Sequence, residues 1–459
     1  MKEIKTAIIP IKTDFVGLKS IIDHKAICIF AATGFFLDDD SYFVGQKALR
    51  PATNYTLSDD NNSIVKEETY FKWHYTPIER PFDQIVDEFT SLFETIIDEQ
   101  VKDKNVILPL SGGLDSRTQA AALKHLNKKV HAYSYEFENG HNETKYAEQI
   151  AKVCDFPFEK WIIPKGYLWK NIEEIASINQ CYTEFTHPRQ AAIMEKLVGL
   201  GEVINLGHWG DVLFDNMDLP SQLSLEDQVD IMIKKVIKKR GIELAEKLWK
   251  SWDLEGDFYT YFRKRIKKLL QEVSISEDAN AQTRAFKSLY WASRWTGSNL
   301  SLFEKVKPIT LPYYDERMCQ FICSVPEKYL AKRQIQIAYL KKRNPELAKI
   351  TWQDQRPFNL YNYHWNLFPW NFPYRVYQKI RKDYIVKNKV SNNYENQFLG
   401  NENEKELKKW LFENQKFKVF VDPSIVEELY KGFKNENHLS YSHVISTLLT
   451  LSLFTKISE

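Results

Sequence analysis

The feature that most constrains this chain is the string SGGLDS at residues 111–116, which directly follows an apolar run at residues 106–110. Two adjacent glycines lack Cβ atoms, so backbone N–H groups can converge on an anion, and a helix that starts here adds the positive end of its dipole. Ser111 and Ser116 supply hydroxyl donors, and Asp115 can hold the magnesium ion that accompanies bound phosphates. The string therefore predicts a phosphate or pyrophosphate site. The alternative is a tight strand-to-helix turn in which Asp115 is only a helix-terminal charge.

The string differs from the two best-known nucleotide loops. It lacks the lysine of GxxxxGK[ST], and it lacks the glycine spacing of GxGxxG. The pattern around it alternates between strands and helices, which predicts parallel strands joined by right-handed crossovers in a doubly wound sheet. Ligands of such sheets bind at the carboxyl ends of the strands. We expect strands at residues 106–110, 130–137, 158–164 and 203–206, and helices at 116–126 and 143–153.

The flanking regions have different patterns. Short β-rich pieces with turn signals between them predict a small antiparallel sheet before residue 80, and a helical period predicts a helix at residues 82–101. Beyond residue 215 the chain is expected to be mostly helical, ending in a buried helix at 444–454. The predicted β pieces are residues 7–15, 26–37 and 41–49, and the predicted domains are residues 1–80, 81–358 and 359–459.

Composition excludes several classes of protein. With 63 Lys and Arg against 61 Asp and Glu, the net charge of +2 does not indicate a nucleic-acid or polybasic membrane surface. The five cysteines form no CxxC pair, which argues against a disulfide framework or a cysteine zinc site. No apolar stretch is long enough for a membrane span, and the N-terminus has no signal-peptide pattern. We therefore expect a cytoplasmic protein.

Several segments resemble, in the right order, the asparagine-synthetase-like family of ATP pyrophosphatases, whose phosphate loop reads SGGxDS. Residues 131–137 resemble the family's second strand, and residues 142–147 resemble the start of the next helix. GHWGDVLF at 207–214 resembles the family's GEGxDElF, and 311–326 resembles its PFLD…P segment. The resemblance covers about residues 81–358, and it implies an adenine-nucleotide alpha-hydrolase-like fold, an α/β sheet followed by an all-helical part.

The resemblance also implies a reaction. A substrate carboxylate attacks the α-phosphorus of ATP, pyrophosphate leaves, and an amine then attacks the acyl-adenylate to form an amide. ATP and Mg²⁺ are therefore expected, with Asp115 and Asp211 at the metal. Nucleotide binding is expected at Leu110, Ser111, Gly112, Gly113, Leu114, Asp115, Ser116, Tyr135, Leu206 and Gly207.

The departures from the family pattern bear on the substrate. His208 stands where the family has the glutamate of GEG, which puts synthesis of asparagine from aspartate in doubt, and Val212 stands where the family has an acid. His208 is a candidate general base toward the amine, or else a histidine that only packs. The family's KxxL lysine has no clean counterpart after Pro326, so Arg333 is the leading substitute and a solvated helix face the alternative. Arg294 and Arg356 are further candidates.

The N-terminal residues bear on the source of the nitrogen atom in the product. Glutamine-using relatives begin with a nucleophilic cysteine at position 2, where this chain has Lys2, and Cys28 is expected to be a core thiol. The first domain is therefore expected to be a reduced, glutaminase-like β domain without activity. The leading hypothesis is an amide ligase that joins a small-molecule or peptide carboxylate to an amine, in a specialised metabolite, peptide or cell-surface glycan pathway. The alternatives are asparagine synthesis from free ammonia and a silent ATP-binding scaffold, and the oligomeric state stays open.

Overall fold

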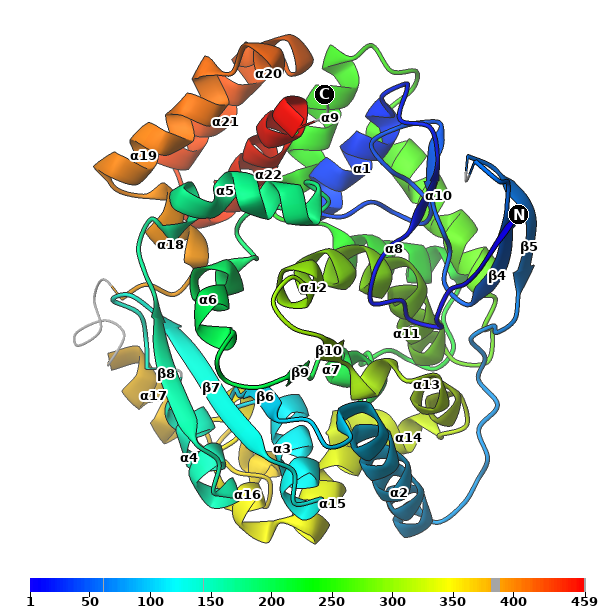
Figure 1. The fold of residues 1–459 in the computed structure, drawn as a ribbon, viewed down its shortest axis with the longest axis vertical. Coiled ribbons are helices and arrows are strands. Elements are labelled where there is room, and N and C mark those ends of the chain that lie inside the picture. Colours follow the sequence, from blue (N-terminus) through cyan, green and yellow to red (C-terminus); the bar gives the residue numbers. More distant parts are fainter. Residues whose placement is uncertain (61, 143, 381–388, 458–459) are drawn as a thin grey trace.

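The fold contains a parallel sheet, which lies at the lower left in Figure 1. The computed structural model describes residues 1–60, 62–142, 144–380 and 389–457, and within them this sheet has five strands in the order β10-β9-β6-β7-β8. Val106 pairs with Val130 on one side and with Val203 on the other, so the strand before the SGGLDS string is the middle one. The doubly wound parallel sheet is confirmed. Its strands are β6 (Val106–Pro109), β7 (Val130–Phe137), β8 (Phe158–Ile163), β9 (Val203–Asn205) and β10 (Ile309–Thr310).

The helices around this sheet also follow the predicted pattern. The helical period at 82–101 forms α2 (Phe82–Val101), and the SGGLDS string leads into α3 (Asp115–His125). The expected helix at 143–153 is α4 (Lys145–Cys154), while Glu143 lies outside the described residues. Helix α3 packs against α2, α4 and α15 (Gln334–Arg343). This packing holds the start of α3 at the carboxyl end of β6.

The remainder of the chain is mainly helical, as expected, and the apolar run at 444–454 lies buried in the last helix. Among the described residues, no helix is long and apolar enough to cross a bilayer. The further helices are α5 (Tyr167–Asn179), α6 (Met194–Leu197), α7 (Gly210–Leu213), α8 (Leu225–Val236), α9 (Gly241–Ser251), α10 (Phe258–Val273), α11 (Ala279–Lys287), α12 (Gly297–Glu304), α13 (Glu316–Cys323), α14 (Glu327–Leu330), α16 (Pro345–Lys349), α17 (Phe372–Ile380), α18 (Asn393–Phe398), α19 (Asn401–Lys408), α20 (Gln415–Phe420), α21 (Pro423–Asn435) and α22 (His438–Ile457).

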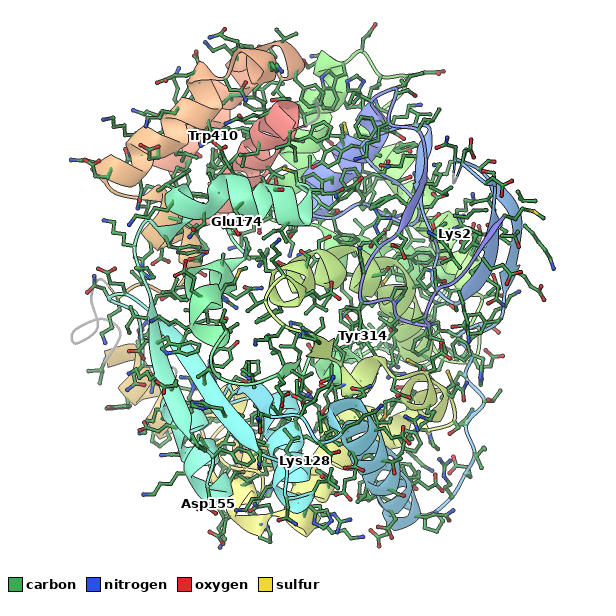
Figure 2. The ribbon with its side chains drawn as sticks, in the orientation of Figure 1. Lys2, Lys128, Asp155, Glu174, Tyr314 and Trp410 are labelled. Atoms are coloured by element: carbon green, nitrogen blue, oxygen red, sulfur yellow. The ribbon has the colours of Figure 1, made fainter. Side chains whose placement is uncertain are left out.

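The N-terminal region contains two small antiparallel sheets where one was expected, and the larger is built from strands outside the predicted pieces, with Lys2 on its outer strand (Figure 2). One sheet has the order β1-β4-β5, and β2 pairs with β3 in the other. The piece at 41–49 contributes β3, but the piece at 7–15 is irregular up to Phe15, where β2 begins. The strands are β1 (Lys2–Lys5), β2 (Phe15–Gly17), β3 (Gln46–Ala48), β4 (Thr53–Leu57) and β5 (Ile64–Thr69).

The strand expected within residues 26–37 is wrong, because this segment forms helix α1 (His24–Thr33). A short, uniformly apolar run has no period that separates a buried strand from a buried helix. The residues at the two ends of the segment explain why it forms a helix. The Asp23 side chain accepts a hydrogen bond from the Ala26 N–H at the start of the helix, and Gly34 ends it in the left-handed conformation. Cys28 is therefore a buried helix residue, and burial raises the pKa of its thiol.

Helix α1 is embedded among helices from distant parts of the chain. It packs on α9, where a Cβ atom at Gly241 would overlap the backbone of Ala32. The Tyr42 ring stacks on Phe454 of α22, with 3.8 Å between ring centroids. One hydrophobic core cluster thus includes residues from Ile8 to Phe454. The domain boundaries at residues 80 and 358 stay predictions.

Candidate active site

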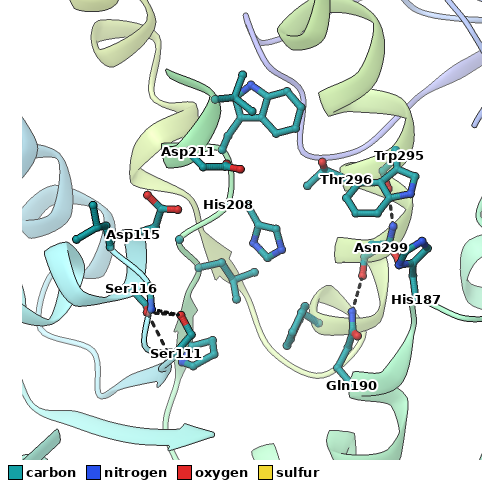
Figure 3. Close-up of a pocket in the computed structure, with 18 of the residues that line it drawn as sticks. Ser111, Asp115, Ser116, His187, Gln190, His208, Asp211, Trp295, Thr296 and Asn299 are labelled. Carbon is teal, nitrogen blue, oxygen red and sulfur yellow. Dashed lines mark hydrogen bonds between the residues drawn. The ribbon is translucent and has the colours of Figure 1, made fainter. Parts of the chain in front are cut away.

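A cavity of about 660 Å³ opens at the carboxyl ends of the central strands. Its walls come from the loops after β6 and β9, from β7, and from the helical segments that follow α11. Figure 3 shows Ser111, Ser116 and Asp115 on one side and His187, Gln190 and Asn299 on the other. The site therefore has a phosphate-loop wall and an opposite wall.

The SGGLDS loop forms the phosphate-loop wall, and its polar groups lie at the cavity. The Ser111 N–H donates to the Ser116 hydroxyl at 3.1 Å, and the two hydroxyl oxygens lie 3.1 Å apart. The Gly113 N–H donates to the Ser111 hydroxyl at 3.2 Å. At the start of α3, which has no side-chain cap, the helix dipole points toward the cavity. The two hydroxyl groups and the uncapped start of α3 suit an anion.

Neither loop glycine has a positive φ, and Gly112 is needed for close packing rather than for left-handed backbone. A Cβ atom at Gly112 would overlap the side chain of Gln353. The Gly112 N–H donates to Gln353 Oε1 at 3.0 Å, and the Gln353 N–H donates back to the Gly112 carbonyl at 3.2 Å. The fully buried Arg117 guanidinium adds bonds to the carbonyls of Gly112, Ile350 and Thr351. Hydrogen bonds to the segment around residue 350 thus hold the loop in place.

Asp115 forms an ion pair with the Arg333 guanidinium at the end of the loop. Gln336 Nε2 also donates to the same carboxylate, at 3.0 Å, and Gln336 Oε1 accepts from Arg333 Nε at 2.8 Å. Burial raises the pKa of Asp115, the Arg333 charge opposes this rise, and the nearby Asp211 carboxylate adds to it. Arg333 itself has a positive φ of 62°. Strained backbone of this kind is concentrated at functional sites.

The loop after β9 passes directly over Asp115. A Cβ atom at Gly207 would lie 3.1 Å from the Asp115 Cβ, and one at Gly210 would overlap the Asp115 carboxylate. These two glycines therefore bring the exposed Asp211 side chain close enough to Asp115 for their charges to interact. Two carboxylates facing one cavity fit Mg²⁺, which usually binds one or two carboxylates and completes its shell with phosphate oxygens and water. In the described part of the chain, no group of three or more His, Cys, Asp or Glu side chains could hold a metal by itself.

His208 lies between the two walls (Figure 3). Burial lowers its pKa to about 4, although the Asp211 carboxylate works in the opposite direction. Its Nδ1 atom is buried and has no hydrogen-bond partner among the described residues. His208 is therefore neutral at pH 7 and offers a ring nitrogen to a ligand.

The opposite wall contains residues that sequence reasoning missed. A π-helical segment, Ser288–Thr296, carries Trp291 and Trp295 into the cavity, and the buried Nε1 atoms of both rings lack partners in the described structure. Lys287 Nζ lies 5.4 Å from the centroid of the Trp291 ring. Burial lowers the pKa of Lys287, and Asp211 opposes this shift. The four-residue spacing of these three side chains was a usable signal for one helix face.

A second missed feature of this wall is the pair of His187 and Glu184. The His187 Nε2 lies 2.8 Å from a Glu184 carboxylate oxygen, and the imidazole lines the cavity edge-on to Trp295 with 5.1 Å between centroids. Glu184 is buried, accepts a bond from the Thr186 N–H at 2.7 Å and another from the Ser446 hydroxyl of α22. Burial opposes ionisation of Glu184, but His187 and the other donors hold its pKa well below the usual range. The pair is spaced i, i+3, which is too common a spacing to mark a site by itself.

The predicted site residues largely come together. All of them line the cavity except Leu110 and Gly112, which are buried beneath the loop. The two weaker arginine candidates do not line it: Arg294 is buried against the carbonyl of Asp38, and Arg356 is exposed. The residues brought together are Ser111, Gly113, Leu114, Asp115, Ser116, Tyr135, Leu206, Gly207, His208, Asp211 and Arg333.

Comparison with known families agrees with this geometry. The family model described as asparagine synthase matches residues 88–455, which is most of the chain. No glutaminase domain is detected ahead of this match. A search of curated proteins gave no match.

Proposed function

This chain belongs to the asparagine synthase family, and on that basis we propose that it forms an amide bond by adenylating a carboxylate, releasing AMP and pyrophosphate. Family membership implies an ATP-dependent carbon–nitrogen ligase domain. The observation that carries the proposal is that the SGGLDS loop, Asp115, Asp211 and Arg333 all face one cavity. We propose a substrate carboxylate and amine from specialised metabolism, a peptide or a cell-surface glycan, and cytoplasmic ATP as the second substrate.

The first step takes place at the phosphate-loop wall. The Ser111 and Ser116 hydroxyls and the N–H groups at the uncapped start of α3 bind the phosphates, while the Ser111 and Gly113 N–H groups hold these hydroxyls in place. The substrate carboxylate attacks the α-phosphorus, the bond to the β-phosphate oxygen breaks, and pyrophosphate takes the negative charge. Arg333 donates to oxygens that gain charge in this step, since a guanidinium fork matches phosphoryl oxygens.

Asp115 and Asp211 would hold Mg²⁺. When bound, the ion would neutralise phosphate charge and orient the pyrophosphate leaving group. The side chains are suited to this role because burial and mutual repulsion already raise the pKa of Asp115, so a cation relieves an unfavourable charge. Asp115 now pairs with Arg333, and a bound cation would free that guanidinium to turn toward phosphate.

The second step takes place toward the opposite wall. The amine attacks the acyl carbon, AMP leaves, and the amine nitrogen loses a proton. His208 is neutral and lies between the walls, so it is placed to hydrogen-bond the reacting groups, but a pKa near 4 makes it a weak base. His187 lines the cavity, and its Nε2 lies 2.8 Å from the Glu184 carboxylate, which fixes the orientation of the imidazole ring. We therefore assign proton removal to His187, with Glu184 as the residue that orients it.

The nitrogen source follows from the N-terminal region. Cys28 is buried in α1 with a raised thiol pKa, so it does not fit a thiol nucleophile, and no glutaminase domain is detected ahead of the family match. The amine is therefore a substrate or free ammonia. Ammonia-dependent asparagine synthesis stays the second candidate within the family, and His208 in place of the family glutamate weighs against it.

The test is a panel of carboxylates and cell extracts incubated with ATP and Mg²⁺, with AMP, ADP and pyrophosphate quantified separately. The proposal predicts substrate-dependent AMP and pyrophosphate that Asp115→Ala abolishes, whereas Asp103→Ala, at an exposed position outside the cavity, does not. ATP binding without turnover across the panel would favour a silent scaffold instead.

A further inference from the structure

The segment at residues 361–380 exposes an unusual number of large apolar side chains. The most exposed are Phe368 at 75%, Trp370 at 69% and Leu367 at 65% of their full surface. A single exposed apolar side chain is ordinary, but a contiguous patch marks an interaction surface. The other members are Tyr361, Trp365, Phe372, Val376, Tyr377 and Ile380.

The base of this segment is fixed to the protein while its tip stands in solvent. The Tyr363 ring packs edge-on to Trp352, and Asn366 Nδ2 donates to Gln355 Oε1 at 2.7 Å. Toward the tip, the exposed rings contact one another: Trp365 stacks with Trp370 at 6.3 Å between centroids. The patch is therefore a projecting aromatic cluster rather than a loosely packed part of the core.

Helix α17 continues the patch with an apolar face that nothing in the described structure covers. Phe372, Val376 and Ile380 follow each other at helical spacing, and all three are exposed. No residue of α17 is buried. An isolated helix of nine residues is marginal in water, so its apolar face needs a partner to contribute stability.

The charge of the segment identifies the kind of partner. Residues 355–380 contain Arg356, Arg375 and Lys379 and no aspartate or glutamate. Aromatic and aliphatic side chains combined with basic ones on a surface helix suit the interface of an anionic bilayer. A symmetric contact between two copies would bring these like charges together, which disfavours self-association.

We propose that residues 365–380 bind peripherally to the surface of an anionic lipid bilayer, with Phe368 and Trp370 inserted at headgroup depth. The Arg375 and Lys379 side chains would then contact lipid phosphates. The proposal does not depend on the chemistry of the cavity. It places the ligase at a membrane surface although no described helix spans one.

The test is flotation of the full chain with vesicles of phosphatidylcholine containing about one third phosphatidylglycerol, and with pure phosphatidylcholine vesicles. We expect flotation with the anionic vesicles only, and release by high salt. The double variant Phe368→Ser/Trp370→Ser should reduce the bound fraction by about tenfold. Val419→Ser, at a side chain that is 90% exposed elsewhere on the surface, should bind as the unsubstituted protein does.

Three results would overturn the proposal. The first is no flotation at either lipid composition, and the second is equal flotation of the double variant. The third is a concentration-dependent dimer without lipid that the double variant abolishes, which would assign the patch to a second copy. Circular dichroism and urea unfolding of each variant verify folding, which the exposure of the substituted side chains favours.

Discussion

The Arg333 guanidinium donates to the Asp115 carboxylate at the floor of the cavity, joining residues that are more than two hundred positions apart. Both side chains are largely buried, and Gln336 completes the arrangement by bonding to each of them. A buried charge pair contributes little net stability, but breaking it by removing one partner is costly. This pair thus favours the ionised form of Asp115 against the effect of burial and holds Arg333 beside the phosphate loop.

Replacing Arg333 with lysine tests whether the reaction needs the planar guanidinium group or only a positive charge. Arg333→Lys keeps a cation but loses the planar fork, and we expect AMP formation to fall by about 10²-fold with ATP affinity changed much less. Steady-state kinetics with a carboxylate found by the panel measure this split. A matched substitution is Arg356→Lys, at an exposed arginine outside the cavity. Equal activity of Arg333→Lys and unsubstituted protein would remove Arg333 from the reaction.

Arg117 should matter for stability more than for chemistry. Arg117→Met would leave the carbonyls of Gly112, Ile350 and Thr351 without their guanidinium partner. Burial also lowers the pKa of Arg117 to about 10, so removing the charge recovers part of its desolvation cost. We expect a net loss on the order of 2 kcal/mol in the free energy of unfolding, measured in urea. An unchanged unfolding midpoint would mean that the loop is held by Gln353 alone.

His208 should make stability depend on pH. Its folded pKa of about 4 lies below the ordinary histidine value of 6.5, so the unfolded chain binds the proton first as pH falls. The group has no effect above pH 6.5, and it destabilises the fold between pH 6.5 and 4 by about 1.4 kcal/mol per pH unit. Glutamine does not titrate, so the His208→Gln variant does not lose stability in this way. The free energy of unfolding of the variant, relative to that of the unsubstituted protein, should therefore rise as the pH falls. A pH-independent difference in urea unfolding would contradict the burial of His208.

His187 should be needed for the amide step and not for adenylation. In His187→Gln, we expect carboxylate-dependent pyrophosphate release to persist while amide product falls by at least about 10²-fold. Rapid-quench measurement of AMP ester, pyrophosphate and amide separates the two steps. The comparison variant is His125→Gln, outside the cavity. A parallel fall in both steps would indicate that His187 only supports the fold.

The sequence predicted the central sheet well because each strand was bounded by helices with a clear period. The range expected for α2 was Phe82–Val101, as observed, and β7 likewise matched its range. Strand β10 was missed because two residues carry no pattern. Helix α1 was mistaken for a strand because every side chain from Ala26 to Thr33 is buried, so no polar face marks the helical period.

The phosphate-loop wall could be predicted because its residues form contiguous strings, SGGLDS and GHWGD. The opposite wall could be predicted only in part. The four-residue spacing of Lys287, Trp291 and Trp295 marks one helix face, but this face meets His187 and the phosphate loop only through tertiary packing. The Gln353 contact with the loop likewise joins segments distant in sequence. Such contacts leave no local pattern.

The most direct test of the account is the fate of the carboxylate oxygen. A carboxylate that supports AMP formation is labelled with ¹⁸O and converted in the presence of ATP and Mg²⁺, and the AMP is analysed by mass spectrometry. Attack of the carboxylate on the α-phosphorus predicts one ¹⁸O atom in each AMP, because the bridging oxygen of the acyl-adenylate stays with the phosphate when the amide forms. Unlabelled AMP, or ADP and phosphate as the products, would contradict adenylation at this cavity.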